Sequence, residues 1–293
     1  MDLRKYEVFL RASECGNLTK AAEELGYTQS GVSHMMKGLE EEFGFPLFTR
    51  TRTGIVVTQE GRRILPAIGE LAKWNEQLRQ VVAQINGFEV GSIRVGVFES
   101  ISYHWMPRIL SRFHREYPRI DVDLLIGGAN EIETWLSERR VDLGVYSLRP
   151  RCGFDSVPLR RDRLVAVLPL DFPVGRRKSF PLEDFNKQPF ISTARGCDFD
   201  IHGIIEKYRI VSDIQFTSTD DHTIVSMVAN GLGVSILAEL MLAGHKNVVR
   251  TLPLKPAMHR TLGMIVPSLK EVSPAVRRFM DCIAAVMKEP EQS

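Results

Sequence analysis

The stretch of sequence that decides the fold is NLTKAAEELGYTQSGVSHMMKGLEEEFGFPLFTR, residues 17–50. It predicts two short helices joined by a tight turn, because helix-capping residues stand where each apolar repeat begins and a glycine stands where the first one ends. Thr19 is a candidate N-cap for the first helix, which turns Ala21 and Ala22 inward. Gly26 can adopt the left-handed backbone that ends a helix without strain, so the turn is expected there.

The second predicted helix follows Thr28, whose hydroxyl can cap its first turn. Apolar residues recur along it with the period of one buried helix face. These residues are Val32, Met36, Leu39 and Phe43. The other face carries Gln29, Ser30, Ser33, His34 and Lys37. Such amide, hydroxyl, imidazole and ammonium groups suit base edges and phosphates, so we expect a DNA-reading helix-turn-helix, although a generic amphipathic helix would share the period.

The stretch resembles the N-terminal domain of LysR-type transcriptional regulators. That family shows Ala-Ala, Leu, a turn, Ser/Thr-Gln, Val-Ser, Leu-Glu and then Gly-x-Pro-Leu-Phe-x-Arg. The matching residues are Ala21, Ala22, Leu25, Thr28, Gln29, Val32, Ser33, Leu39, Glu40, Gly44, Pro46, Leu47, Phe48 and Arg50. The chain departs from the pattern at Ser30, where Pro is common. It also departs at His34, which lacks the permanent cation that the family's Arg offers to a phosphate or guanine.

The next segment, TRTGIVVT at residues 51–58, predicts a short hairpin with Thr53 and Gly54 at the turn. The resemblance implies that this hairpin is the wing of a winged helix-turn-helix. Arg50 and Arg52 would then lie along the DNA backbone or in the negative minor groove; the alternative is that they are solvated loop arginines. The predicted DNA-binding residues are Thr19, Gln29, Ser30, Ser33, His34, Lys37, Arg50 and Arg52.

The composition limits the class of protein. With 293 residues the chain is long enough for two or three units that each bury a core. The net charge is +2, and residues 1–58 hold seven basic against eight acidic residues, so the case for DNA binding rests on where the charges lie. The N-terminus lacks a signal-peptide pattern and no segment reaches the roughly 20 apolar residues of a membrane span, so we expect a soluble, cytoplasmic protein without a membrane partner.

The cysteines are widely separated and form no Cys-x-x-Cys pair. They are Cys15, Cys152, Cys197 and Cys282. Neither a disulfide framework nor a metal site is therefore indicated. Cys197 lies in the sequence RGCD, and some members of the resembled family sense oxidants through two nearby cysteines of the equivalent domain. A redox-sensing regulator that uses Cys197 is an alternative, with Cys152, 45 positions away, as the nearest partner in sequence.

Residues 59–87 predict one long linker helix with a heptad stripe. Two series that repeat every seven positions, offset by four, form the seam by which two helices pack together. The predicted dimerisation seam consists of Ile64, Ile68, Leu71, Asn75, Leu78, Val82 and Ile85. Gly61 and Pro66 indicate an irregular start, Gly87 an end, and Asn75 a fixed register. The resemblance implies antiparallel pairing with a second subunit; packing of the stripe on its own chain is the alternative.

From Ser92 onward the sequence alternates between strand and helix patterns. The first three predicted strands are residues 92–98, 120–126 and 141–147. Such alternation predicts a parallel sheet covered by helices. A second unit of the same kind begins near Arg163. A last strand and a helix from Pro274 to Lys288 are expected to return to the first unit.

These features resemble the two-lobed effector-binding domain of LysR-type regulators, which is shaped like a periplasmic binding protein. The matching residues are Pro107, Phe113, Tyr117, Pro118, Val141, Asp142, Leu143 and the run from Asn230 to Val234. The predicted fold is therefore α/β, with an N-terminal winged helix-turn-helix at 1–58, a linker helix at 59–87 and a C-terminal two-lobed α/β effector domain. Lobe I comprises 92–161 and 266–293, and lobe II comprises 162–265.

Candidate effector-binding hydroxyls follow the predicted strands, at the sheet edge where open α/β sheets bind ligands. They are Ser100, Ser102, Ser192, Thr193 and Ser218. They could donate hydrogen bonds to an effector carboxylate, although each could equally be a plain helix cap. Glu99 would repel an anion, which leaves the class of effector open.

Together these patterns predict a sequence-specific transcriptional regulator that is switched by a small molecule bound between its lobes. The expected partners are double-stranded DNA, further copies of the chain in a homodimer or homotetramer, and the effector, with no resident cofactor or metal. An enzyme is not expected, since the sequence has no Gly-x-Ser-x-Gly, His-Glu-x-x-His or phosphate-cradling glycine loop. A solute-binding protein would account for the two lobes, but not for the helix-turn-helix or the missing signal peptide.

Overall fold

The structure of the protein is a computed structural model, and it describes residues 2–52, 54–85, 90–149, 152–186, 188–242, 244–245 and 247–289. The predicted turn residue Thr53 and the predicted helix end at Gly87 lie outside the described residues. Residues 290–293, the last ones assigned to lobe I, also lie outside them. The chain forms two compact units, Met1–Phe88 and Glu89–Ser293, and each is described by itself.

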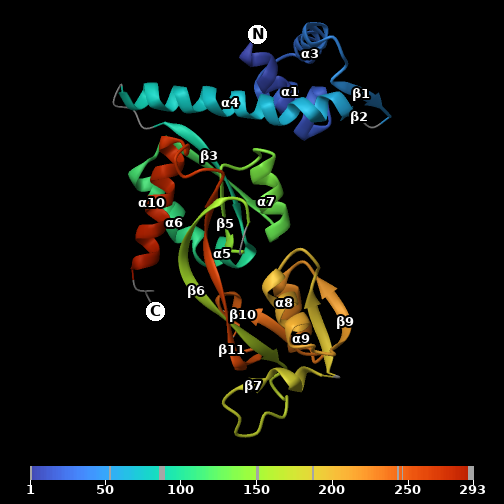
Figure 1. The fold of residues 1–293 in the computed structure, drawn as a ribbon, viewed down its shortest axis with the longest axis vertical. Helices are drawn as coiled ribbons and strands as arrows, with labels where there is room; N and C mark the ends of the chain where they lie inside the picture. Colours follow the sequence, from blue (N-terminus) through green and yellow to red (C-terminus); the bar gives the residue numbers. More distant parts are fainter. Residues whose placement is uncertain are drawn as a thin grey trace. The chain divides into compact units, whose positions relative to one another are not determined.

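Unit 1 (Met1–Phe88) contains the predicted helix-turn-helix and hairpin (Figure 1). Its elements are α1 (Leu3–Cys15), α2 (Leu18–Leu25), α3 (Gln29–Phe43), the antiparallel strands β1 (Phe48–Thr51) and β2 (Gly54–Val57), and α4 (Gln59–Ile85). The predicted cap at Thr19 is wrong. The N-cap of α2 is Asn17, two residues earlier, whose side chain is as good a cap as that of Thr. Its Oδ1 accepts hydrogen bonds from the N–H groups of Thr19 and Lys20 at 2.8 and 3.3 Å. The predicted cap at Thr28 is confirmed, since its Oγ1 accepts from the N–H of Gly31 at 3.1 Å.

The core of unit 1 joins α1, α2 and α3 to the first half of α4. Its buried residues are Tyr6, Val8, Phe9, Ala22, Val32, Met36, Leu39, Leu47 and Ile68. The predicted apolar face of α3 is thus buried, except that Phe43 is half-buried. Oε1 of Glu40 accepts hydrogen bonds from the N–H groups of Leu47 and Phe48 at 2.7 and 3.2 Å, so α3 fixes the point where the hairpin begins.

The linker helix α4 is continuous through Pro66, so the irregular start predicted from Gly61 and Pro66 is not a break. Gly61 is needed for packing instead, because a Cβ there would lie 2.8 Å from a backbone carbonyl oxygen. The structure corrects the predicted dimerisation seam at its beginning. Ile68 is 3% exposed and Ile64 is half-buried, and both pack in the core of their own unit. The exposed part of the stripe begins at Leu71.

Unit 2 (Glu89–Ser293) is built on a mixed sheet. Its strands lie in the order β10 (Ser235–Ala238), β6 (Asp155–Leu168), β11 (Arg250–Val266), β5 (Leu143–Ser147), β3 (Gly91–Val97) and β4 (Ile120–Ile126). The predicted parallel arrangement is confirmed for β4 (Ile120–Ile126), β3 (Gly91–Val97) and β5 (Leu143–Ser147). Four helices pack around these strands to form lobe I (Figure 1). They are α5 (Glu99–His104), α6 (Met106–Glu116), α7 (Ala129–Ser137) and α10 (Pro274–Lys288). The C-terminal helix therefore returns to the first lobe, as predicted.

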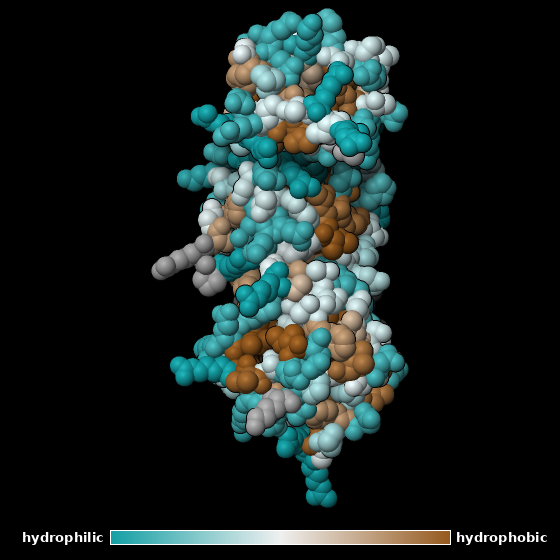
Figure 2. Space-filling view, turned by 90° about the vertical axis from the view of Figure 1, so that its right-hand side faces the viewer, coloured by the Kyte–Doolittle hydropathy of each residue, from teal (hydrophilic) through white to brown (hydrophobic). Residues whose placement is uncertain are grey.

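Lobe II has its own core and its own small parallel sheet. Its elements are β7 (Phe180–Pro181), η1 (Leu182–Phe185), β8 (Pro189–Thr193), α8 (Phe199–Lys207), β9 (Asp213–Ser218), α9 (Asp221–Ala229), β10 (Ser235–Ala238) and η2 (Glu239–Leu242). The edge strand β9 leaves Ile214 and Phe216 exposed. Figure 2 looks at the side of the molecule on which β9 lies in Figure 1, and it shows brown, apolar surface over lobe II.

Two long strands, β6 (Asp155–Leu168) and β11 (Arg250–Val266), run antiparallel through both lobes (Figure 1). Leu164 of β6 lies in the core of lobe II, whereas Leu262, Met264 and Ile265 of β11 lie in the core of lobe I. The return to lobe I therefore occurs at or before Leu262, earlier than the predicted boundary at 266. The sequence could not mark this boundary, because the crossing falls inside an unbroken strand.

Within the described ranges, none of the helices combines the length and the apolar composition that crossing a membrane requires.

Candidate functional site

The polar face of α3 is the first candidate site. Gln29, Ser30, His34 and Lys37 are exposed and Ser33 is half-buried. Because the apolar face of α3 is held in the core, these side chains project together from the second helix of the helix-turn-helix. Nζ of Lys37 lies 3.9 Å from a carboxylate oxygen of Glu41. Such an exposed pair is weak, so Lys37 can turn to a phosphate.

The remaining predicted DNA contacts lie on neighbouring elements of unit 1. Thr19 is exposed on α2, Arg50 on β1, and Arg52 in the turn between β1 and β2. The hydrogen bonds of Glu40 to the start of the hairpin tie this wing to α3. The structure thus places all eight predicted residues on one small unit, with the wing held in a fixed position relative to the polar helix face.

A second surface of unit 1 is the apolar stripe on the later half of α4. The exposed side chains on it are Leu71, Trp74, Leu78, Val81, Val82 and Ile85, between 38% and 79% exposed. Trp74 and Val81 were not part of the predicted seam. Asn75, predicted to lie in it, is half-buried. An exposed apolar patch of this kind on a single chain marks an interaction surface.

A cavity of about 320 Å³ lies between the two lobes of unit 2. Lobe I contributes the end of β3, the start of α5 and the segment before α7, and lobe II contributes the ends of β8 and β9. The lining residues are Phe98, Glu99, Ser100, Ile126, Gly127, Gly128, Glu131, Thr193, Cys197, Asp198, Thr219, Asp221 and Arg260. This is the edge of the sheets at which the sequence predicted an effector site.

Arg260, on the crossing strand β11, is the centre of the polar contacts in this cavity, and it is not among the residues that the sequence predicts for the site. It is 3% exposed, and its Nε and Nη2 lie 2.9 Å from Oδ2 of Asp162. Its Nη1 lies 3.4 Å from Oδ2 of Asp198, and its Nη2 donates to Oγ of Ser100 at 3.0 Å. Burial opposes its charge, but the facing carboxylates outweigh burial, so the pKa of Arg260 is raised. Arg260 thereby ties β6, lobe I and lobe II together.

The other charged groups of the cavity are acidic. Burial, followed by the charge of Asp198, raises the pKa of Asp221 to about 7. Burial and a hydrogen bond with Asp220 raise the pKa of Glu99. Oε2 of Glu99 also accepts a hydrogen bond from the N–H of Asp221 at 3.5 Å, which links the two lobes. The cavity is therefore a place where negative charge is concentrated and poorly hydrated.

Only two of the five predicted effector-binding hydroxyls line the cavity. Ser100 accepts from Arg260, and Oγ1 of Thr193 is buried without a hydrogen-bond partner. The other three use their hydroxyls on nearby backbone instead. Ser102 donates to the carbonyl of Glu99 at 2.8 Å, Ser192 to that of Thr193 at 3.1 Å, and Ser218 to that of Asp220 at 3.1 Å. None of these three residues caps a helix, so the alternative of a plain helix cap is also wrong for them.

Cys197, the candidate redox residue, also lines the cavity. Burial, together with the charges of Glu131 and Asp221, raises the pKa of its thiol. An oxidant sensor needs a thiolate and therefore a lowered pKa. Cys152 lies in lobe I, where its Sγ is 3.7 Å from the carbonyl oxygen of Phe154. These surroundings do not favour Cys197 as a redox switch.

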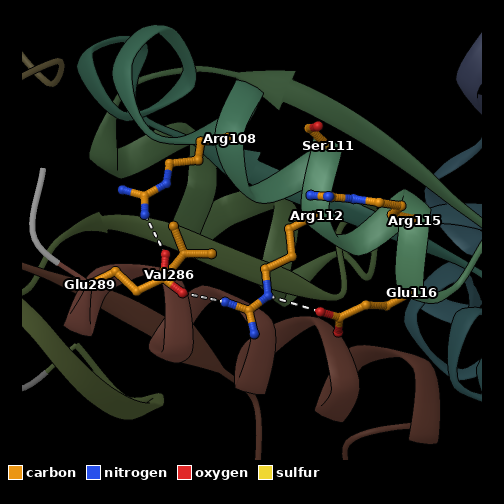
Figure 3. A pocket seen from close by; sticks show the side chains of 7 residues that line it. All are labelled: Arg108, Ser111, Arg112, Arg115, Glu116, Val286 and Glu289. Carbon is orange, nitrogen blue, oxygen red and sulfur yellow. Dashed lines mark hydrogen bonds and ion pairs between the residues drawn. The ribbon is translucent and has the colours of Figure 1, made fainter. Parts of the chain in front are cut away.

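A larger hollow, of about 620 Å³, lies on lobe I between α6 and α10 (Figure 3). Arg108 and Arg112 of α6 both point toward Glu289, and Arg112 also donates to Glu116 at 2.9 Å (Figure 3). These charges are therefore already paired at the surface. The smaller cavity between the lobes is the better candidate for a ligand site, because buried polar groups converge on it from both lobes.

Two family models match the chain. Residues 3–62 match "Bacterial regulatory helix-turn-helix protein, lysR family", and residues 86–288 match "LysR substrate binding domain". A relative from Bacillus subtilis (strain 168), the "Uncharacterized HTH-type transcriptional regulator YvbU", is 33% identical over 285 residues. The match covers 96% of this chain and 97% of that protein.

Solved structures show the same fold. A full-length OxyR variant from Pseudomonas aeruginosa is similar with a TM-score of 0.77 and 21% identity, over 100% of this chain and 99% of that one. Full-length CbnR complexed with its target DNA is similar with a TM-score of 0.66 and 19% identity, over 98% of this chain and 100% of that one.

Proposed function

The chain belongs to the LysR family of bacterial helix-turn-helix transcriptional regulators, and from this premise we propose how its own residues act. Unit 1 reads a specific double-stranded DNA site through α3 and the hairpin. Two copies assemble through the exposed stripe of α4. A small molecule in the cavity between the lobes of unit 2 changes the DNA-binding state.

The observation that carries the DNA-binding proposal is the exposed polar face of α3 on a helix whose other face is buried. Gln29 can make the paired hydrogen bonds that distinguish adenine, and Ser33 can bind either a base edge or a phosphate. Arg50 and Arg52 on the hairpin supply sequence-independent phosphate contacts. CbnR, which has the same fold, is seen with its target DNA. This supports the same partner for the present chain.

The proposal of self-assembly rests on α4. Its side chains from Leu71 to Ile85 leave an apolar stripe open to solvent, which association of two copies would bury. A two-fold dimer would present two copies of α3, so its DNA site should consist of two inverted half-sites. Pairing of dimers into tetramers is a further step of the same proposal.

The proposal of an effector switch rests on the two long strands that join the lobes. A ligand that contacts both lobes can favour one arrangement of them, because the strands β6 and β11 allow hinge movement. The relatives of the chain are transcriptional regulators, and we propose that it acts by binding rather than by catalysis. Its proposed DNA partner also argues for a place in the bacterial cytoplasm.

The proposed function is tested by selecting duplexes from a random-sequence pool with the purified full-length chain. We expect a recurring motif of two inverted half-sites, and we expect Gln29→Ala to lose the preference for it. Arg176→Ala, which removes an exposed charge in lobe II, is the matched control and should select the same motif. Selected pools without any shared motif would contradict the proposal.

A further inference from the structure

We propose that the ligand of the cavity between the lobes is a small organic cation that carries a protonated amine or amidine. This differs from the carboxylate-bearing effector considered from the sequence. The inference rests on the proposed function, in which this cavity holds the effector.

The first argument is the charge of the cavity wall. Four carboxylates line it, and they are Glu99, Glu131, Asp198 and Asp221. Among the described residues that line the cavity, Arg260 carries the one basic side chain. An anion entering here would be repelled from both lobes, whereas a cation would be attracted to both.

Arg260 already forms ion pairs with two carboxylates. Arg260 is buried against Asp162 at 2.9 Å and Asp198 at 3.4 Å, and its third contact is Oγ of Ser100 at 3.0 Å. Its guanidinium also lies 5.9 Å from the centre of the Phe98 ring. Using Arg260 to bind a carboxylate ligand would require breaking these contacts. Glu99, Glu131 and Asp221 accept no hydrogen bond from it.

The second, independent argument is an unpartnered polar atom in the wall. Thr193 is 3% exposed, and its Oγ1 has no hydrogen-bond partner. A buried hydroxyl without a partner destabilises the folded state, so such groups are rare in folded proteins. Thr193 lines the cavity, so a ligand N–H that reaches this side chain can donate to the hydroxyl oxygen.

The size and the wall of the cavity favour an organic molecule over a metal ion. A volume of about 320 Å³ is at the lower end of the range for small-molecule sites. Phe98 and Ile126 provide apolar surface for the body of such a ligand. Throughout the part of the chain that the structure describes, no cluster of three or more His, Cys, Asp or Glu side chains is arranged to hold a metal ion.

The placement of the carboxylates also connects this ligand class to the switch. Glu99 and Glu131 belong to lobe I, and Asp198 and Asp221 belong to lobe II. Like charges on facing lobes repel each other when the cavity is empty. A cation between them removes this repulsion and favours the arrangement in which the lobes are close. The ligand would thus have the unequal affinity for two states that a switch requires.

The test uses probes that match in size and differ in charge. Binding of benzamidine, benzamide and benzoate to the full-length chain is measured by calorimetry, and putrescine and succinate form a second, flexible pair. We expect each cation to bind more tightly than its anionic counterpart by about tenfold or more, which corresponds to about 1.4 kcal/mol.

Two variants locate the binding. The pKa of Asp221 is raised to about 7, so binding is measured at pH 8, where its carboxyl is mostly ionised. Asp221→Asn keeps the side-chain size and removes a buried charge, so it should fold normally and weaken benzamidine by about tenfold or more while changing benzamide little. Thr193→Val should weaken any probe that occupies the cavity and hydrogen bonds to this hydroxyl. Asp171→Asn removes an exposed carboxylate of lobe II and is the matched control, which should change neither probe.

The outcomes separate the ligand class from the site itself. Tighter binding of the carboxylates, weakened by Thr193→Val, would overturn the cation proposal and leave the cavity as the effector site. Failure of every cationic probe to bind, or cation binding that neither variant weakens, would overturn the cation proposal as well. If no probe of either charge responds to Thr193→Val or to Asp221→Asn, the cavity also loses its proposed role, while the DNA-binding proposal is judged separately by the duplex selection.

Discussion

Replacing Arg260 with Met should destabilise unit 2 by about 3–5 kcal/mol, because it removes one partner of a buried ion network and leaves the other partners charged. Two carboxylates, Asp162 and Asp198, lie 2.9 and 3.4 Å from the guanidinium, which is 3% exposed. Met fills a similar volume, so the expected loss reflects the unpaired charges rather than a new hole. Adding Asp198→Asn to this variant should restore part of the stability, since Asn removes one unpaired charge and still caps α8.

The free energy of unfolding of unit 2 is measured by urea denaturation of the full-length variants. Arg163→Met is the control, because Arg163 is the neighbour of Asp162 on β6 and pairs with Glu239 at 2.8 and 2.9 Å on the exposed surface. Its loss should cost no more than about 1 kcal/mol. Equal losses for Arg260→Met and Arg163→Met, or a further loss on adding Asp198→Asn, would refute the reasoning.

Four further predictions concern the DNA face, the stripe and the cavity. Gln29→Ala should cost about 1–3 kcal/mol of binding free energy on the specific duplex and little on random DNA. Arg52→Ala should weaken binding to both duplexes and lower the salt dependence of binding. Equal losses on the two duplexes for Gln29→Ala in a binding titration would rule out base reading by this residue. Leu78→Glu should dissociate the assembled protein and Glu76→Gln should not, and light scattering that gives an unchanged mass for Leu78→Glu would mean that the stripe does not hold the copies together. Thr193→Val should leave the melting temperature of the ligand-free chain unchanged or higher, because it removes an unpartnered buried hydroxyl, while effector affinity falls by about 1–3 kcal/mol; a lower melting temperature without ligand would contradict this. Because the pKa of Asp221 is raised to about 7 when folded, against about 3.9 when unfolded, the folded state keeps a proton that the unfolded chain releases, so the stability contributed by this residue decreases as pH rises from about 4 to about 7. Asp221→Asn should therefore gain melting temperature over the wild type at pH 8 and not at pH 4, and a gain of equal size at both pH values would count against this assignment.

The helix-turn-helix could be predicted because its signals are local. The apolar period of α3, the cap at Thr28 and the hairpin all lie within a few tens of residues, and each has a distinct residue pattern. The error at Thr19 has the same origin, since Asn17 offers an equal cap two positions away. Ile64 and Ile68 were misassigned for a different reason. A heptad stripe shows which face of a helix is apolar, but not whether its own unit or a second copy covers it.

The cavity could be predicted only in part. Ser100 and Thr193 were found because ligand sites of open sheets lie where strands end. Arg260 was not found, because its partners are separated from it by between 62 and 160 positions and no period marks them. Acidic residues after three of the strand ends, Glu99, Asp198 and Asp221, were a usable signal. Only the fold brings them to one place, which is why the sequence left the class of effector open.

The linker helix α4 belongs to the core of unit 1 in its first half and exposes an apolar stripe in its second half, so its helical period fixes the angle between the two. Its early residues, such as Ile68, are fixed in the core under the DNA-reading unit, while Leu71 and the residues after it form the exposed stripe. Inserting one alanine between Ile68 and Leu71 would turn the stripe by about 100° around the helix axis relative to α3, whereas inserting seven would nearly restore the angle and lengthen the rod by about 10 Å. If copies pair through the stripe, the number of residues between Ile68 and Leu71 therefore sets the direction in which each recognition helix points. A single-residue insertion there would abolish binding to paired half-sites while leaving each unit folded.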